Sequence, residues 1–434
     1  MSSIKNQTIQ ATGLKAIWRS MAFVFMLLLC LSATNLVQAQ QQTMNLDSVL
    51  LRIRNSNPML QEYNYRARAM DAYAEGARSW MPPMVGAGLY MLPYPGQEVM
   101  EGRDKGMLMF TAEQAIPNPA KQRAKEEYMR SRAALETAAS DVTFNQLRTQ
   151  AKEAYYNRVV LERKMNVLQE SERIVTYMLK LARVRYPYSK GSLGSIYKAE
   201  ARLHGVENMQ LMTASQIAQQ TILLNTLMNQ PKEFTFSIDT TVTVPDLSQL
   251  ASDTAYLAAA RSDVRQLDRT IASMQLNLQL EQLERKPDFS IRFDHMYPRD
   301  NMMPQQFTAM GMVSIPIAPW SSKMYKANSR AMQLEIEGMK KQREAILNEA
   351  QGMVRTMALE LKTVQEQTEN YSTKILPALK KNYDVTMLAY EQNTAQLPEV
   401  IDAWEALNMA RIEYLDKLQD LYLMVVNYER EIEK

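Results

Sequence analysis

The sequence predicts a mainly α-helical protein with a small β part. Three observations support this fold class. The 434-residue chain contains only 13 Gly and 17 Pro, which favours long uninterrupted elements. Residues 120–186 contain neither Gly nor Pro, and apolar side chains recur there at spacings of three and four. Two segments, 84–117 and 288–317, each contain a pair of strand-like runs around a turn-rich stretch.

The first 39 residues have the pattern of a cleaved secretory signal peptide. Positively charged residues precede the apolar run 21–31, and Val37-Gln38-Ala39 offers a small-residue cleavage site. A membrane-anchoring helix is the alternative, but the run is shorter than the roughly 20 residues that a span needs. Lipidation at Cys30 is a second alternative, disfavoured by Leu28 and Leu29 where small residues are normally found.

Composition excludes several classes of function. The chain is 46% apolar and 22% charged, as in folded proteins. Its formal net charge of +3 includes three cations from the leader, so no basic footprint for nucleic acid remains. Cys30 is the only cysteine, and the two histidines, His204 and His295, lack metal-ligand spacing. Without a phosphate-binding Gly-rich loop either, we expect no enzyme and no cofactor.

The amphipathic segment 120–186 predicts one very long helix of coiled-coil type. At 1.5 Å per residue it would reach roughly 100 Å, longer than an ordinary globular core needs. Other long helices are expected at about 46–79, 195–229, 251–285, 321–389 and 399–432.

The strand pairs are expected at 84–93 with 105–117 and at 288–298 with 305–317. Alternation is clearest in the third strand, where one face holds Phe289, Ile291, Phe293 and His295, and the other holds Ser290, Arg292 and Asp294. This pattern suits a transmembrane barrel strand. A soluble hairpin packed on a core gives the same alternation. Aromatic residues lie near the ends of the pairs: Trp80, Tyr90, Tyr94, Tyr297, Trp320 and Tyr325.

An internal two-fold repeat organises the chain. Residues 186–199 align without gaps on 390–403, and each half runs helix, strand pair, very long helix, break, helix. We therefore divide the mature chain into a first repeat, 40–230, a strand-rich linker, 231–250, and a second repeat, 251–434. The breaks, 186–195 and 390–398, are the tips of two helical hairpins.

Four strands cannot close a barrel from one chain, because outer-membrane barrels need at least eight and an open edge is not tolerated in lipid. If the strands span a membrane, several chains must share one barrel. Three chains would supply twelve strands, and their long helices would form a tube continuous with it.

This layout resembles the TolC family of outer-membrane efflux proteins over essentially the whole mature chain. The resemblance rests on Arg261 with Asp263, Pro287 before a strand, the SIPI stretch at 314–317, and the two helical breaks. It implies a homotrimer with a barrel in outer-membrane lipid and an α-helical tunnel in the periplasm. The implied partners are a periplasmic adaptor protein and an inner-membrane pump. A type I protein-secretion duct and a non-membrane coiled-coil scaffold remain the rival interpretations.

The family pattern also implies functional residues at the tips. Tyr390 matches a family tyrosine, Asn393 a glycine, and Glu399 and Asp402 two acids that face the pore. Rings of carboxylates would repel one another and attract cations, so they could form a periplasmic gate or selectivity site. Acids placed favourably at a helix start are the alternative explanation. Ala395 stands where some members carry an arginine that ties the tip closed.

The tips are also where the family contacts its adaptor, at Arg185–Ser195 and around Asn393–Leu397. The residues expected to act as hinges or adaptor contacts are Asn393, Ser189, Gly191, Gly194 and Pro398.

Methionine is unusually abundant, with 32 in the chain. Many lie in the strand pairs: Met81, Met84, Met91, Met100, Met107, Met109, Met296, Met302, Met303, Met310 and Met312. Thioethers prefer soft ions such as Cu(I), so Met302, Met303, Met310 and Met312 are candidate metal ligands and the heavy-metal branch of the family is one expectation. Flexible packing is the alternative use of methionine.

Overall fold

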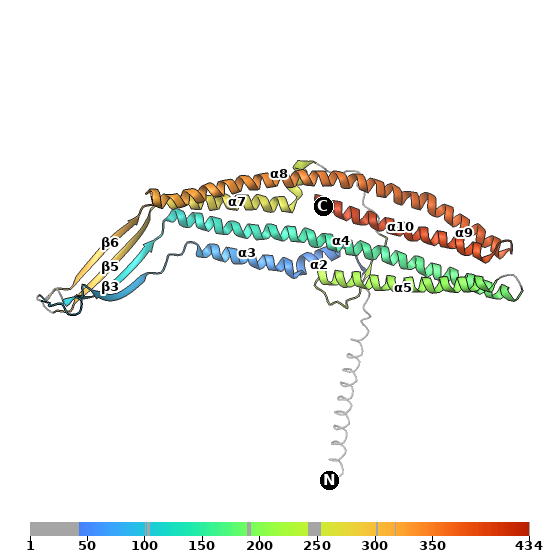
Figure 1. The fold of residues 1–434 in the computed structure, drawn as a ribbon, viewed down its shortest axis with the longest axis horizontal. Helices are drawn as coiled ribbons and strands as arrows, with labels where there is room; N and C mark the ends of the chain where they lie inside the picture. The colour runs from blue at the N-terminus through green and yellow to red at the C-terminus, as the bar shows by residue number, and fades with distance from the viewer. Residues whose placement is uncertain are drawn as a thin grey trace, which may run out of the picture.

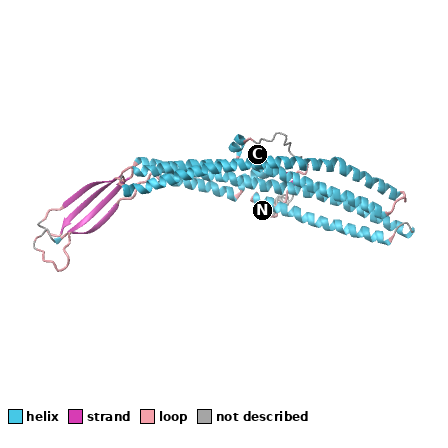
Figure 2. Cartoon of the chain, turned by 45° about the horizontal axis from the view of Figure 1, so that its top comes forward, coloured by secondary structure: helices cyan, strands magenta, loops and turns pink. Residues whose placement is uncertain are grey.

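The computed structural model describes residues 43–99, 101, 105–188, 192–241, 253–300, 303–316 and 318–433. The molecule is long and narrow, with a β-sheet at one end and two helical hairpin tips at the other (Figures 1 and 2). None of the helices in the described part of the chain combines the length and apolar character needed to cross a membrane.

In the described part of the first half the α-helices are α2 (Leu46–Ser56), α3 (Pro58–Gly76), α4 (Pro119–Arg185) and α5 (Leu193–Leu227). The 67-residue α4 confirms the predicted long helix. The single helix expected at 46–79 is instead two, because Asn57 caps α3 by accepting the Met59 N–H at 3.0 Å and Pro58 has no N–H to donate.

The second half contains α6 (Thr254–Ala260), α7 (Ser262–Gln282), α8 (Pro319–Asn370), α9 (Leu376–Glu391) and α10 (Leu397–Ile432). The helix expected at 251–285 is divided at Arg261, which has extended backbone. The helix expected at 321–389 is continuous through a π turn, η5 (Tyr371–Ile375), two residues before Pro377. Short 3-10 turns are η3 (Tyr186–Tyr188) and η4 (Leu283–Arg285).

The two strand pairs join into one four-stranded antiparallel sheet in the order β2-β3-β5-β6. Its strands are β2 (Met84–Tyr90), β3 (Met107–Ile116), β5 (Asp288–Pro298) and β6 (Gln306–Ser314). The linker contributes only β4 (Ser237–Ile238), which pairs in parallel with β1 (Thr43–Met44). The rest of the expected linker, from 242, lies outside the described residues.

The sheet has two chemically different faces, as the alternation predicted. Phe289, Ile291 and Phe293 lie on one face and are 44%, 54% and 45% exposed. On the opposite face, Arg292 pairs with Asp294 at 3.0 Å. The apolar face is thus the more exposed one in the isolated chain.

Two large apolar cores and a smaller one, which joins α6, α8 and α10, hold the described helices together. The larger lies where α2, α4, α5 and α10 meet, and includes the rings of Tyr156 and Tyr422 stacked at 4.6 Å. The second extends to the tips and joins α4, α5, α9 and α10 around Met178, Val400 and Trp404. Helices α4, α5 and α10 contribute to both large cores and thus join the middle of the molecule to the tips.

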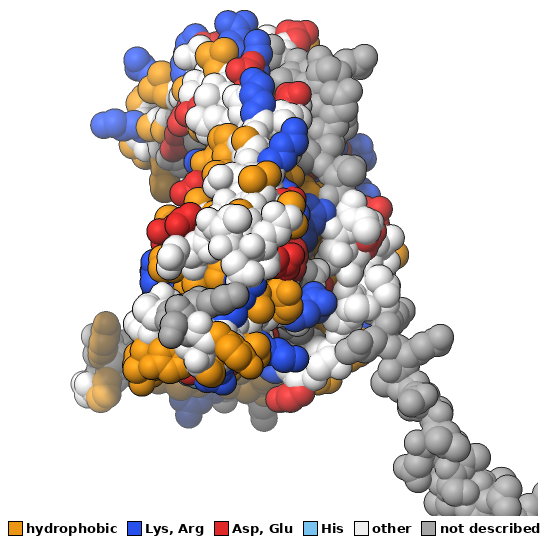
Figure 3. Space-filling model, turned by 90° about the vertical axis from the view of Figure 1, so that its right-hand side faces the viewer, with side chains coloured by type: hydrophobic (Ala, Val, Ile, Leu, Met, Phe, Trp, Pro, Cys, Tyr) orange, Lys and Arg blue, Asp and Glu red, His pale blue; other side chains and the backbone are white. Residues whose placement is uncertain are grey.

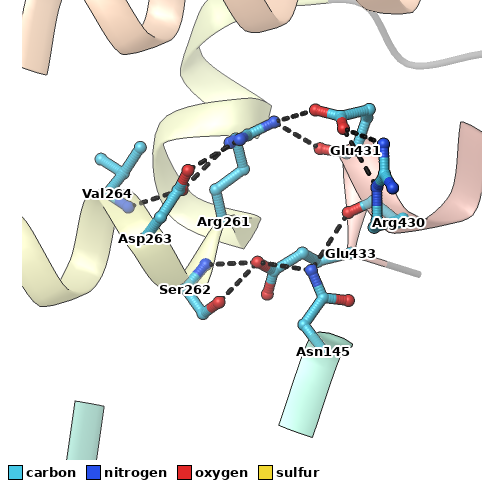
Figure 4. A network of polar contacts seen from close by, with 8 residues as sticks. All are labelled: Asn145, Arg261, Ser262, Asp263, Val264, Arg430, Glu431 and Glu433. Atoms are coloured by element: carbon cyan, nitrogen blue, oxygen red, sulfur yellow. Dashed lines mark hydrogen bonds and ion pairs between the residues drawn. The ribbon is translucent and has the colours of Figure 1, made fainter. Parts of the chain in front are cut away.

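A buried polar junction fixes the end of α10 to the α6–α7 corner (Figure 4). Arg261 donates to Asp263 at 2.7 and 3.0 Å, and to the Glu431 carboxylate at 2.7 Å. Burial lowers the pKa of Arg261, but the hydrogen bonds to Asp263 and Glu431 raise it by more than burial lowers it. The pKa of Arg261 therefore lies above its ordinary value. Glu433 accepts from the Ser262 N–H at 2.8 Å and from Asn145 of α4 at 3.1 Å.

We expect Arg261→Met to reduce the free energy of unfolding by about 3 kcal/mol, because the carboxylate of Glu431 would lose its buried partner. Arg343→Met is the matched control, since Arg343 pairs with Asp268 at 2.7 Å on the exposed surface between α7 and α8 and should cost less than about 1 kcal/mol. Denaturant unfolding followed by helical circular dichroism measures both. Equal losses would contradict the assigned role of burial.

Candidate functional site

The two hairpin tips lie at the same end of the molecule, opposite the sheet (Figure 1). Figure 3 looks onto this end, where acidic, basic and hydrophobic side chains are interspersed. One tip joins α4 to α5 through η3, and the other joins α9 to α10. The described residues that were expected at the tips lie in these connections or in the helix turns next to them.

The first tip ends at a capped helix. The Ser192 hydroxyl accepts the Ser195 N–H at 3.2 Å at the start of α5. Gly194 lies in the first turn of α5 without left-handed backbone, and a Cβ there would meet only the Ser192 hydroxyl at 4.0 Å. The backbone therefore does not require glycine at this position. Ser189 and Gly191 lie outside the described residues.

The second tip turns at Asn393, which has the expected left-handed backbone with a φ of 63°. Its N–H donates to the Tyr390 carbonyl at 2.9 Å, and the Thr394 N–H donates to the Ala389 carbonyl at 2.9 Å. Pro398 lies in the first turn of α10, where a missing N–H is tolerated. The turn thus closes the end of α9 before α10 begins.

Arg185, at the end of α4, fastens the first hairpin to the second. Its guanidinium donates to the carbonyl oxygens of Tyr390 at 2.6 Å and of Glu391 at 3.0 Å. It also lies 4.3 Å above the Tyr390 ring. Tyr390 is only 3% exposed, and burial raises the pKa of its phenol, an effect that Arg185 partly offsets. Within one chain, Tyr390 is therefore a packing residue beneath Arg185.

The two expected acids have different surroundings. Asp402 accepts from Lys198 of α5 at 2.8 Å, and Arg202 and Glu405 form a second ion pair between α5 and α10. Lys198 and Asp402 occupy corresponding positions of the gap-free alignment between the two tips. Glu399 is exposed in the first turn of α10, and its side chain contacts no hydrogen-bond or ion-pair partner among the described residues. Glu399 is thus the acid whose charge is not compensated locally.

Sequence reasoning missed the contacts of Arg185, Lys198 and Arg202. A signal for one of them was present, because Lys198 stands opposite Asp402 in the alignment of the two halves. Nothing in the sequence pattern marked Arg185, since its partners are backbone carbonyls and any residue could supply those.

The expected metal ligands are separated from the tips. Met310 and Met312 lie in β6, Met303 lies between β5 and β6, and Met302 is outside the described residues. Over the described ranges, no group of three or more His, Cys, Asp or Glu side chains could hold a metal ion.

The fold is that of known outer-membrane channels. The chain matches a structure of the outer-membrane channel OprN with a TM-score of 0.69 and 14% identity, over 89% of each chain. It matches CusC, whose structures concern transmembrane channel formation, with a TM-score of 0.71 and 13% identity over 89% of this chain and 91% of CusC. It matches VceC, an outer membrane protein from Vibrio cholerae, with a TM-score of 0.67 and 15% identity over 89% of this chain and 95% of VceC.

The TM-scores of these matches show a shared fold, and at such low sequence identity the matches carry no further conclusion. No protein-family model matches the sequence, and no curated protein matches it.

We expect Arg185→Met to increase hydrogen exchange of the amides at 389–396 about tenfold or more, because hydrogen bonds from a charged donor contribute about 1.5–3 kcal/mol. Lys198→Met should increase it less than about fivefold, since its pair with Asp402 is exposed. Native-state exchange read by mass spectrometry tests both variants. If Lys198→Met had the larger effect, the ion pair rather than Arg185 would hold the tips together.

Proposed function

We propose that the chain is a TolC-family outer-membrane channel and serves as the exit duct of a tripartite efflux system. It would conduct substrates passively from an inner-membrane pump and a periplasmic adaptor, without catalysis of its own. The observation that carries this proposal is the likeness of the fold to OprN, CusC and VceC over 89% of the chain.

The sheet supports a shared barrel formed by a homotrimer. Strands β2 and β6 are the edges of the sheet in a single chain, so each has a free row of backbone groups. Three chains would join these edges into twelve strands, above the minimum of eight. The exposed apolar face, with Val85 81% and Phe307 70% exposed, would contact lipid. Exposed aromatic residues near the strand ends, such as Trp320, would lie at the membrane surface.

The tips would form the periplasmic entrance. In a trimer, three copies of Glu399 would form a ring of uncompensated carboxylates that favours cations. Asp402 would contribute less while Lys198 pairs with it. Tyr390 would act through the packing of the turn. Ser189, Gly191, Gly194, Asn393 and Pro398 would belong to the hinge and the surface that the adaptor contacts.

Metal cations are the cargo that we propose within this class. The support is the abundance of methionine, 32 residues in the chain, many of them in the strand pairs. Drugs or a secreted polypeptide could use the same duct, and a periplasmic scaffold would leave the sheet outside any membrane.

Deleting the gene in its host should make the host sensitive to exported compounds, because an efflux system without its exit cannot clear them. We expect sensitivity to copper and silver salts in a panel that also contains zinc, cobalt and hydrophobic drugs. Minimal inhibitory concentrations measure this, with the restored gene as control. Sensitivity to drugs alone would exclude metal as the cargo, and recovery of the protein in the soluble fraction without detergent would favour a scaffold.

In planar bilayers, we expect Glu399→Gln to lower the cation-over-anion permeability ratio by about twofold or more, since it removes the uncompensated charge. Asp402→Asn should change the ratio less. Glu344→Gln, on α8 and paired with Lys341 at 2.9 Å, is the control. Reversal potentials under a salt gradient give the ratios. An unchanged ratio in Glu399→Gln would reject the acid-ring assignment.

A further inference from the structure

The methionines of the sheet all lie on one face. The strands contain one methionine in β2, two in β3, one in β5 and two in β6. The pairing register places every one of them on the same side, opposite Phe293 and its neighbours: Met84, Met107, Met109, Met296, Met310 and Met312.

This face is also the polar one. All the charged side chains of the four strands share it with the methionines, namely Glu113, Asp288, Arg292 and Asp294. The large aliphatic and phenylalanine side chains of the strands take the other face: Val85, Leu89, Leu108, Phe110, Ile116, Phe289, Ile291, Phe293, Phe307 and Val313. Methionine used only as apolar filler would be expected among the latter group. The strand methionines lie on the face opposite the aliphatic and phenylalanine side chains, which indicates that they have a function on the polar face.

The register brings three of the thioethers close together. Met109 stands directly opposite Met296 in the β3–β5 pair, and Met107 is the next residue of β3 on the same face. Directly opposed residues have Cβ atoms about 4.5–5.5 Å apart, and methionine has three rotatable bonds with which to adjust. On the other side, Met109 faces Gly88, where an added Cβ would meet nothing within 4 Å. There is therefore open space beside the Met109 side chain.

The charged side chains on this face leave one acid, Glu113, without an ion-pair partner among the described residues. Three acids, Glu113, Asp288 and Asp294, share it with one base, Arg292. The guanidinium of Arg292 is hydrogen-bonded to Asp294 at 3.0 Å, so its charge is largely compensated. At the end of the sheet next to the helices, Asp288 pairs with Lys121 of α4 at 2.8 Å. Near the methionine group no uncompensated base lies among the described strand residues.

We propose that Met107, Met109 and Met296 form a thioether site for a soft monovalent cation, Cu(I) or Ag(I), on the polar face of the sheet. The inference rests on the proposed function, because this face would line the lumen only in a shared barrel. The site would make soft monovalent cations the cargo of the channel. Neutral thioethers select soft ions over Zn²⁺ or Co²⁺, which prefer imidazole, thiolate or oxygen. Met310 and Met312, two residues apart in β6, would provide a second contact along the same surface.

Such a site suits passage rather than storage. Conduction needs binding that is favourable enough for entry but weak enough for release. Uncharged sulfur ligands without a thiolate meet that requirement, and the mature chain has no cysteine to trap the ion if the leader is removed.

The test measures Ag(I) binding to the full chain, purified in detergent, by isothermal titration with silver nitrate in chloride-free buffer. The site variant is Met109→Leu with Met296→Leu, which keeps volume and apolar character while removing both sulfur atoms. The matched control is Met212→Leu with Met409→Leu, two exposed methionines on α5 and α10. We expect the site variant to lose affinity for Ag(I) at least tenfold or to lose one bound ion per chain, and the control to bind as the parent chain does.

Equal Ag(I) binding by the site variant and the control would overturn the inference. The single variant Met296→Gln, polar on a polar face, keeps the test decisive if the double variant fails to fold, and should weaken binding at least threefold. Bilayer conductance of the same preparations separates this inference from the proposed function. If the channel conducts and the Met109→Leu/Met296→Leu and Met296→Gln variants bind Ag(I) as the parent chain does, only the thioether site is rejected. A chain that binds Ag(I) through these methionines but forms no channel rejects only the duct.

Discussion

The packing of α4 is the interaction on which the rest of the structure depends. This one helix connects the sheet to the first tip, and α3, α5, α7 and α10 all pack along it. Both large apolar cores include its side chains, and Arg185 at its end secures the second hairpin. Most of the stability of helices in proteins comes from tertiary packing of their apolar face, and in this chain that packing is centred on the 67-residue α4.

The sequence predicted most of the fold because its signals are local. The absence of Gly and Pro specified α4, and alternation specified the faces of β5. The joining of the two strand pairs through β3 and β5 was not predictable, since pairing between residues nearly 200 positions apart leaves no local pattern. Helix breaks at Asn57 and Arg261 were also missed, because both depend on capping and on partners that are distant in the chain.

At the tips, the sequence predicted the candidate functional residues but not the side chains that surround them. The left-handed turn at Asn393 follows from its side chain type. The difference in charge compensation between Glu399 and Asp402 does not follow from their own side chains, because Lys198 on another helix pairs with Asp402. Methionine shows the same limit. Its abundance is visible in the sequence, whereas its restriction to one face of the sheet needs the register of all four strands.

The π turn at Tyr371–Ile375 gives the second hairpin a mechanical property that the first lacks. It interrupts the regular hydrogen bonding of the helix just before Pro377, which itself has no N–H to donate, and helices bend at such interruptions. The segment from the π turn to Asn393 then works as a lever of roughly 27 Å, at 1.5 Å per residue. A rotation of only about 5° at that position would move the turn by about 2 Å, whereas α4 is one uninterrupted α-helix from Pro119 to Arg185.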